Sequence, residues 1–319
     1  MTSFAVENRR EADRTETPAR SGSRRTRQGQ GSAYLLLSPW IIGAALLTIG
    51  PMVASLYLSF TDYDLFDPPH WIGLRNYATM FGHDPRFWHA ASVTLRYVVL
   101  SVPLKLGLAL AVALVVNQAR RGLGFYRAAF YGPSLLGATV SLALVWRTMF
   151  STHGVIDRVL SAFGLHTGGW IDQPQYALLT LVALAVWQFG TPMVIFLAGL
   201  KQVPQELYDA AATDGAGRLR TFRSVTLPMI SPVLLFNIVL ETIHAFQAFT
   251  SSYVVSSGRG GPSDATLFYT LYIYQRGFAD FRMGYAAAMA WVLLVVVAVV
   301  TAVLFRLSRI WVFYTGESP

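Results

Sequence analysis

The chain has 319 residues, of which 54% are hydrophobic and 13% are charged. The charged share is about half of the roughly 25% found in soluble domains, which excludes a soluble globule, and the apolar content excludes a disordered chain. The absence of cysteine excludes disulfides, thiolate metal sites and a cysteine nucleophile. The formal net charge of +8 comes largely from residues between long apolar stretches. That distribution is typical of a membrane protein rather than a nucleic-acid-binding one.

Residues 1–32 differ in composition from the rest of the chain. They hold seven arginines and four acidic residues among serine, glycine and glutamine, without apolar periodicity. This composition predicts a disordered, basic cytoplasmic arm. We interpret the arm chiefly as a topology signal and a solubilising tail, with contact to anionic lipid head groups as the alternative.

Six apolar segments follow, each long enough for the ~20 residues with which a helix crosses the hydrocarbon core. They are apolar all round, and backbone groups in lipid must be satisfied within the segment, so they are predicted to be helices rather than barrel strands. The last contains no charged residue from Met283 to Phe305. The segments are 33–60, 90–116, 128–150, 176–200, 229–251 and 283–305.

The basic residues predict the orientation. With the N-terminus inside, the inner segments hold sixteen lysines and arginines and the outer loops hold six. This excess places both termini in the cytoplasm, with 306–319 as a short cytoplasmic tail. The expected location is therefore a bacterial-type plasma membrane, crossed several times.

Enzyme chemistry is nearly absent from the sequence. Lys105 and Lys201 are the two lysines and each follows leucine, so the Gly-Lys pair of a phosphate-binding loop is missing. One Glu-x-x-His occurs, Glu241 to His244, whereas di-iron bundles need two such pairs and two further glutamates. We therefore expect no catalytic residue, no metal site and no cofactor bound by this chain.

The inner loop 201–228 is the most informative stretch. Pro204 suits a first helical turn, and Glu206 and Asp209 lie near the positive end of that helix. Asp214 and Gly215 predict a turn, in which Asp214 caps a second short helix. That second helix is expected to stop before Pro228.

This loop carries a family resemblance. Asp209-Ala210-Ala211 is followed after three residues by Gly215, and after nine more by Val225-Thr226-Leu227-Pro228. The spacing resembles the Glu-Ala-Ala, Gly, Ile-x-Leu-Pro pattern of permease subunits of binding-protein-dependent ABC importers; Asp209 replaces the usual glutamate and Val225 the usual isoleucine. The runs LSPWIIGAALLTIGPMVASLYLSFTDYD, WIGLRNYATMF and FQAFTSSYVVSSGRGGP are similar to the sugar-transporting, maltose-type branch.

The resemblance implies an all-α fold of six transmembrane helices over 33–305, the type I importer permease fold. It implies import of a mono- or oligosaccharide by alternating access. The implied partners are a second homologous permease, two ATPase subunits that bind ATP and Mg, an extracytoplasmic solute-binding protein and membrane lipid, with no nucleic acid. The residues expected to dock to the ATPase are Glu206, Asp209, Ala210, Ala211, Gly215, Leu227 and Pro228. Alternatively, Glu206 and Asp209 only complement the helix dipole.

The substrate path is expected along the fifth segment. Asn237, Glu241 and His244 share one helical stripe, with Gln247 at its edge, and they serve either to recognise hydroxyls or to join helices. Phe246-Gln247-Ala248-Phe249 is similar to a Phe-Asn-Asn-Phe pattern near the family's sugar site. Lys105 lines the pathway or pairs with an acid of the partner permease. Trp187, like Trp146, stacks on sugar or marks the membrane interface.

Two other function classes stay open at this point. An ion-driven secondary transporter usually has more helices and inverted repeats, and a membrane enzyme would have to use Glu241 and His244. Within the importer class, a glycerol-phosphate permease is the alternative to a sugar permease.

Overall fold

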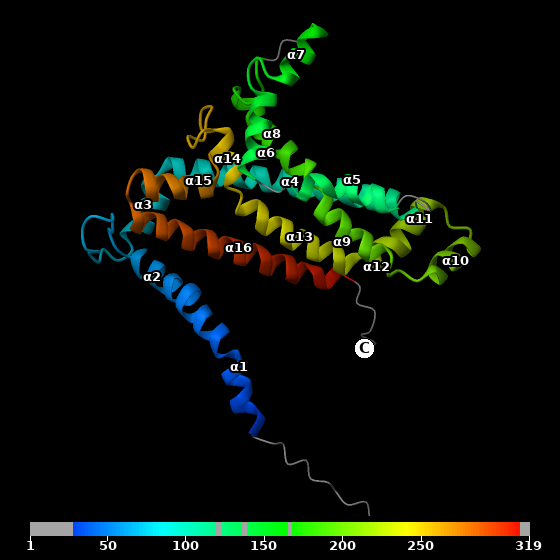
Figure 1. The fold of residues 1–319 in the computed structure, drawn as a ribbon, viewed down its shortest axis with the longest axis horizontal. Coiled ribbons are helices and arrows are strands. Elements are labelled where there is room, and N and C mark those ends of the chain that lie inside the picture. Colours follow the sequence, from blue (N-terminus) through cyan, green and yellow to red (C-terminus); the bar gives the residue numbers. More distant parts are fainter. Residues whose placement is uncertain (1–27, 119–122, 136–138, 165–167, 313–319) are drawn as a thin grey trace, which may run out of the picture. The chain divides into compact units, whose positions relative to one another are not determined.

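The computed structural model describes residues 28–118, 123–135, 139–164 and 168–312. Nearly all regular structure within these ranges is helical, with one isolated antiparallel bridge between Thr61 and Trp71 (Figure 1). The chain divides into two compact units, Met1–Met52 and Val53–Pro319. The expectations for 1–27 and 313–319 lie outside the described residues.

The first helices cover the first apolar segment. They are α1 (Gln28–Ala44), the π-helical turn η1 (Ala45–Ile49) and α2 (Gly50–Leu58). Residues 36–58 are long and apolar enough to cross a membrane. Helix α1 begins at Gln28, before the predicted start of the segment at residue 33.

The second unit contains the remaining helices. They are α3 (Arg75–His83), α4 (Pro85–Gln118), α5 (Leu123–Leu135), α6 (Val140–Phe150), α7 (Val155–Ala162), α8 (Pro174–Trp187), α9 (Gly190–Leu200), α10 (Gln205–Thr213), α11 (Arg218–Thr221), η2 (Phe222–Thr226), α12 (Leu227–Met229), α13 (Ser231–Phe246), α14 (Thr250–Val255), α15 (Tyr269–Tyr274), η3 (Gln275–Ala279) and α16 (Met283–Trp311).

Four spans and one bent helix pair meet the length and composition of a membrane crossing. The four are 36–58, 85–118, 231–255 and 283–311, and the pair is α8 with α9, bent by 42°. The described residues therefore provide up to five crossings, which coincide with five of the six predicted segments. The predicted segment 128–150 falls on α5 and α6, between which residues 136–138 lie outside the description.

Helix α4 packs against α8, α9 and α13 and so forms the centre of the bundle (Figure 1). Ala109 and Ala113 in α4 are fully buried. Gly199 allows α9 to lie close to α13, because a Cβ at this position would lie 2.9 Å from a methyl group of Val233. Small residues let helices in a membrane approach closely, where van der Waals packing holds them together.

One carboxylate joins the start of α4 to three other elements, α15, η3 and α16. Asp84, directly before α4, accepts hydrogen bonds from the hydroxyls of Tyr272 (2.6 Å) and Tyr285 (2.7 Å), and Arg276 lies 3.4 Å away. Burial alone would raise the pKa of Asp84, but the two hydroxyls, the Phe87 backbone N–H and Arg276 together hold that pKa below its usual value. We call these four side chains, Asp84, Tyr272, Arg276 and Tyr285, the Asp84 cluster.

Candidate functional site

Two membrane helices are interrupted at the same place in the bundle. Helix α8 ends at Trp187 and α9 begins at Gly190, while α13 ends at Phe246 and α14 begins at Thr250. In the first break, Pro192 lacks a backbone N–H and its ring would clash with the carbonyl four residues earlier. Irregular backbone at membrane depth is tolerated where protein or a water-filled cavity satisfies it.

Helix α5 satisfies part of the first break. The Ser134 hydroxyl donates to the Gln188 carbonyl (3.1 Å) and accepts from the Thr191 N–H (3.2 Å). Gly190 allows this approach, because a Cβ there would lie 2.5 Å from the Phe130 carbonyl oxygen. The glycine is therefore required by close packing of α5 on α9.

A cavity of about 340 Å³ lies where the two breaks meet. We call it the break cavity. Helix α4 forms one wall, α8 with Gln188 the second, and α13 with the start of α14 the third. Its lining residues are Tyr97, Ser101, Val102, Lys105, Leu181, Leu184, Ala185, Gln188, Glu241, His244, Ala245, Gln247, Ala248, Phe249, Thr250 and Ser251.

An ion pair stands in the wall of this cavity. Lys105 Nζ of α4 donates to Glu241 Oε2 of α13 at 2.7 Å. Their side chains are only 15% and 10% exposed. An unpaired charge in a membrane helix is costly, by about 2.5–3.5 kcal/mol on insertion scales, so each group offsets the cost of the other. The pair leaves both heads at the cavity surface.

The structure brings together most of the predicted path residues. Lys105, Glu241, His244 and Gln247 all line the break cavity. The pairing of Lys105 within this chain corrects the expectation that its acid belongs to a partner permease. Asn237 does not line the cavity: it is 1% exposed, and its Nδ2 has no hydrogen-bond partner among the described residues.

Trp187 does not line the cavity either; it directly precedes Gln188, which does. Sequence reasoning missed several polar lining residues. The signal for Gln188 was present, since Gly190-Thr191-Pro192 interrupts an apolar segment and such interruptions point to binding sites. The missed residues are Tyr97, Ser101, Gln188, Thr250 and Ser251.

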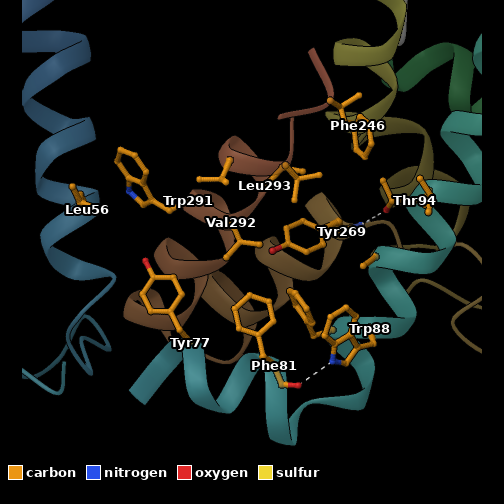
Figure 2. Close-up of a pocket in the computed structure, with 16 residues that line it drawn as sticks. Leu56, Tyr77, Phe81, Trp88, Thr94, Phe246, Tyr269, Trp291, Val292 and Leu293 are labelled. Carbon is orange, nitrogen blue, oxygen red and sulfur yellow. Dashed lines mark hydrogen bonds between the residues drawn. The ribbon is translucent and has the colours of Figure 1, made fainter. Parts of the chain in front are cut away.

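A second, larger cavity has different chemistry. It measures about 680 Å³ and is bounded mainly by side chains of α3, α4 and α16. Figure 2 shows Tyr77, Phe81, Trp88 and Trp291 around it, with the Trp88 Nε1–H directed at the Phe81 carbonyl. Its almost entirely apolar wall would leave sugar hydroxyls without partners, which is unfavourable, so it is not the candidate solute site.

The predicted inner loop folds as a bent helix pair. Helix α10 spans Gln205–Thr213, with Pro204 at its N-cap. Gly215 has φ +70°, the left-handed conformation in which glycine closes helices. Its N–H bonds to the Ala212 carbonyl (3.0 Å), and the next N–H bonds to the Ala211 carbonyl (2.9 Å). The turn at Gly215 is thus a glycine-dependent end of α10.

Two details of the loop differ from expectation. Asp214 ends α10 rather than capping the next helix, which begins after Gly217 without a side-chain cap. The helical path then continues through η2 into α12, past Pro228. Pro228 is the second residue of α12 and directly follows the π-helical turn η2.

The expected docking residues lie together on this bent pair. Glu206, Asp209 and Ala210 are exposed on α10, and Gly215 is exposed at the turn. Tyr208 fixes the pair by a hydroxyl contact of 3.3 Å to Thr226. Leu227 and Pro228 are partly buried in α12. Helix α10 therefore presents an acidic and small-residue surface, whereas Arg218, Arg220 and Arg223 are exposed on α11 and η2. The α10–α12 segment lies at one end of the bundle (Figure 1).

Comparison with known proteins identifies the family. The model for the family described as "Binding-protein-dependent transport system inner membrane component" matches residues 84–311. The chain belongs to this family. The matched region runs from the start of α4 to the end of α16. The chain is thus a permease component of the inner membrane with several apolar helices.

Individual relatives agree with this assignment. The probable ABC transporter permease protein YesP of Bacillus subtilis is 48% identical over 296 residues, 92% of this chain and 96% of YesP. The sulfoquinovosyl glycerol transport system permease protein SmoG of Agrobacterium fabrum is 32% identical over 281 residues, 87% and 90% of the two chains. A bacterial alginate ABC transporter in complex with its pentasaccharide-bound periplasmic protein shares the fold, with a TM-score of 0.76 at 22% identity over 88% of this chain and 95% of that chain.

Proposed function

We propose that this permease passes a mono- or oligosaccharide from an extracytoplasmic binding protein into the cytoplasm by alternating access. In this proposal it crosses the membrane six times, with α5 and α6 forming one crossing and both termini in the cytoplasm. The α10–α12 segment is then cytoplasmic, and the beginnings of α4 and α16 lie on the outer side.

The break cavity carries the proposal. Its wall combines an ammonium, a carboxylate, amides and hydroxyls in the middle of a membrane bundle. Sugar hydroxyls both donate and accept hydrogen bonds, so they match mixed donors and acceptors. Broken helices around a central cavity are also how transporters place substrate sites. The names of SmoG and of the alginate transporter, both concerned with sugars, support the same substrate class.

A glycerol phosphate is less well matched to this cavity. The basic residues that line the cavity are Lys105 and His244, and Lys105 is already paired with Glu241. A phosphate would have to displace that carboxylate.

The driving energy enters through the α10–α12 segment in this proposal. Two partner ATPase subunits bind ATP and Mg, and the exposed acidic face of α10 docks to one of them. A second, homologous permease completes the pathway. Closure of the ATPase dimer biases the permease between inward and outward states, which requires contacts that differ between the two states.

The test is sugar-stimulated ATP hydrolysis by the complete importer in proteoliposomes. The probe is a radiolabelled mixture of di- to tetrasaccharides from partial hydrolysis of starch and plant cell-wall polysaccharides. We expect a Gly215→Pro variant to lose stimulation, because proline fixes φ near −65° and the turn needs +70°. Gly217→Ala is the matched control, because φ is −68° there and no atom lies near its Cβ position.

Uptake of labelled sugar by this chain alone, driven by an ion gradient, would contradict the proposal. So would equal stimulation in the Gly215→Pro variant and the wild type, since the docking turn would then have no part in coupling.

A further inference from the structure

Five aromatic rings form a continuous ladder beside the break cavity. The ring centroids are 6.1 Å apart for Tyr176 and Trp170, 5.9 Å for Trp170 and Phe150, 4.8 Å for Phe150 and Trp146, and 6.2 Å for Trp146 and Trp187. Each ring is tilted by 34° to 45° against the next. We call these five residues the aromatic ladder.

Helix periodicity explains how the sequence builds the ladder. Tyr176 and Trp187 are eleven residues apart on α8, so at about 100° per residue they point in nearly the same direction. Thr180 between them is small and leaves room for the neighbouring helix. Trp146 and Phe150, one turn apart on α6, fill that room, and the Trp146 Nε1–H donates to the Thr180 carbonyl (2.9 Å).

The outer part of the ladder borders a cavity of its own. This cavity, about 520 Å³, is lined by Phe150, Trp170, Tyr176 and the side chains of Gln173 and Gln175. Gln175 Nε2–H donates to Gln173 Oε1 at 3.2 Å, which holds both side-chain amides at the wall. Tyr176 is 42% exposed, so this end of the ladder is accessible.

The inner end of the ladder lies one residue before the wall of the break cavity. Trp187 is the last residue of α8, and Gln188 directly after it lines the break cavity. Helix α6, which carries two rungs, also packs against α14, whose Thr250 lines that cavity. The ladder therefore extends from an accessible aromatic cavity to Trp187, which directly precedes the lining residue Gln188.

We propose that the aromatic ladder is a second carbohydrate-binding site, at which a sugar released by the binding protein is held before it enters the break cavity. The apolar C–H faces of a pyranose ring pack on the aromatic rings, and its hydroxyls bond to the amides of Gln173 and Gln175. This inference rests on the proposed function, because it needs the break cavity to be the sugar site.

The direction of the ladder distinguishes it from an interfacial aromatic belt. Belt residues lie in the plane of the membrane–water interface. From Tyr176 to Trp187 the ladder instead follows α8 for about 16 Å at the rise of an α-helix, roughly half of the hydrocarbon thickness. A path along a span suits transfer across the membrane.

The test uses the complete importer in proteoliposomes with the labelled di- to tetrasaccharide mixture named above. The readout is the amount of sugar trapped per ATP hydrolysed. We expect Trp170→Ala to lower this ratio by about 3-fold to 10-fold, the range of one aromatic contact. ATP hydrolysis stimulated by the loaded binding protein should stay unchanged, and Trp170→Tyr should restore the ratio. Trp88→Ala, an exposed tryptophan outside the ladder, is the control.

Three results would overturn the inference. The first is a wild-type ratio in Trp170→Ala. The second is loss of subunit assembly in both Trp170→Ala and Trp170→Tyr, which would make this face an interface with the partner permease. The third is a wild-type importer whose ATP hydrolysis responds to no sugar in the mixture; that result contradicts the proposed function itself, and so is distinguishable from failure of the ladder alone.

Discussion

Removing one member of the Lys105–Glu241 pair should destabilise the permease more than removing both. The two heads are 2.7 Å apart and largely buried. Glu241→Gln leaves the Lys105 charge facing a neutral amide inside the membrane bundle. Loss of one partner of a buried pair costs about 3–5 kcal/mol, whereas replacing both by uncharged groups is often nearly neutral.

The magnitude follows from the partial exposure of the pair. Both heads border a cavity, so water reaches them and the lower end of that range applies, about 3 kcal/mol for each single variant. The double variant Lys105→Met/Glu241→Gln should cost about 1 kcal/mol or less, which gives a coupling at or above the upper end of the usual 0.5–3 kcal/mol for contacting residues.

The assay is chemical unfolding of the purified importer in detergent micelles, for the wild type, both single variants and the double variant. The exposed pair Arg86–Asp264, whose side chains are 46% and 31% exposed, is the control and should show coupling below about 1 kcal/mol. A double Lys105/Glu241 variant as unstable as the two single costs combined would refute the reasoning, because the charges would then not interact.

Three further predictions concern other parts of the fold. Gly215→Ala should lower coupled ATP hydrolysis far more than Gly217→Ala, because only position 215 has a left-handed backbone conformation. That conformation costs alanine about 1–2 kcal/mol. Equal rates of hydrolysis in the two variants would contradict this prediction. Gly190→Ala should destabilise the complex by about 1–3 kcal/mol through overpacking on α5, and an unchanged melting temperature would exclude that packing. The pKa of Asp84 is lowered in the folded state, so the ionised carboxylate stabilises the fold above about pH 4. This stabilisation is lost as the pH falls through the folded-state pKa. Asp84→Asn should therefore flatten the acid limb of a melting-temperature profile; a wild-type limb would contradict it.

The apolar segments were predictable because each is continuous in the sequence. Five of the six coincide with helices or a helix pair of sufficient length. The bent loop was predictable for the same reason: Pro204, Asp209 and Gly215 lie within a dozen residues and act on neighbouring backbone. The exact helix ends were less predictable, since Asp214 is able to cap either neighbouring helix and local propensity does not decide between them.

The composition of the cavity could be predicted only in part. The stripe of Glu241 and His244 follows from helical periodicity, which is a property of one segment. The pairing of Glu241 with Lys105 joins residues far apart in the chain, so this contact depends on how α4 and α13 pack. Tyr97 gave no signal, because tyrosine in an apolar segment is equally compatible with a core or an interface position.

The Asp84 cluster limits where the permease is able to change shape. The Asp84 carboxylate accepts hydrogen bonds from two hydroxyls and pairs with a guanidinium, which belong to α15, α16 and η3. Sliding any of these elements past the start of α4 would therefore leave a buried charge without a partner. These elements must then travel as a single rigid block. The change in shape then falls on the chain around Gln188 and Gln247, where the helices are already interrupted. Both residues line the break cavity, so the hinges coincide with the walls of the proposed solute site.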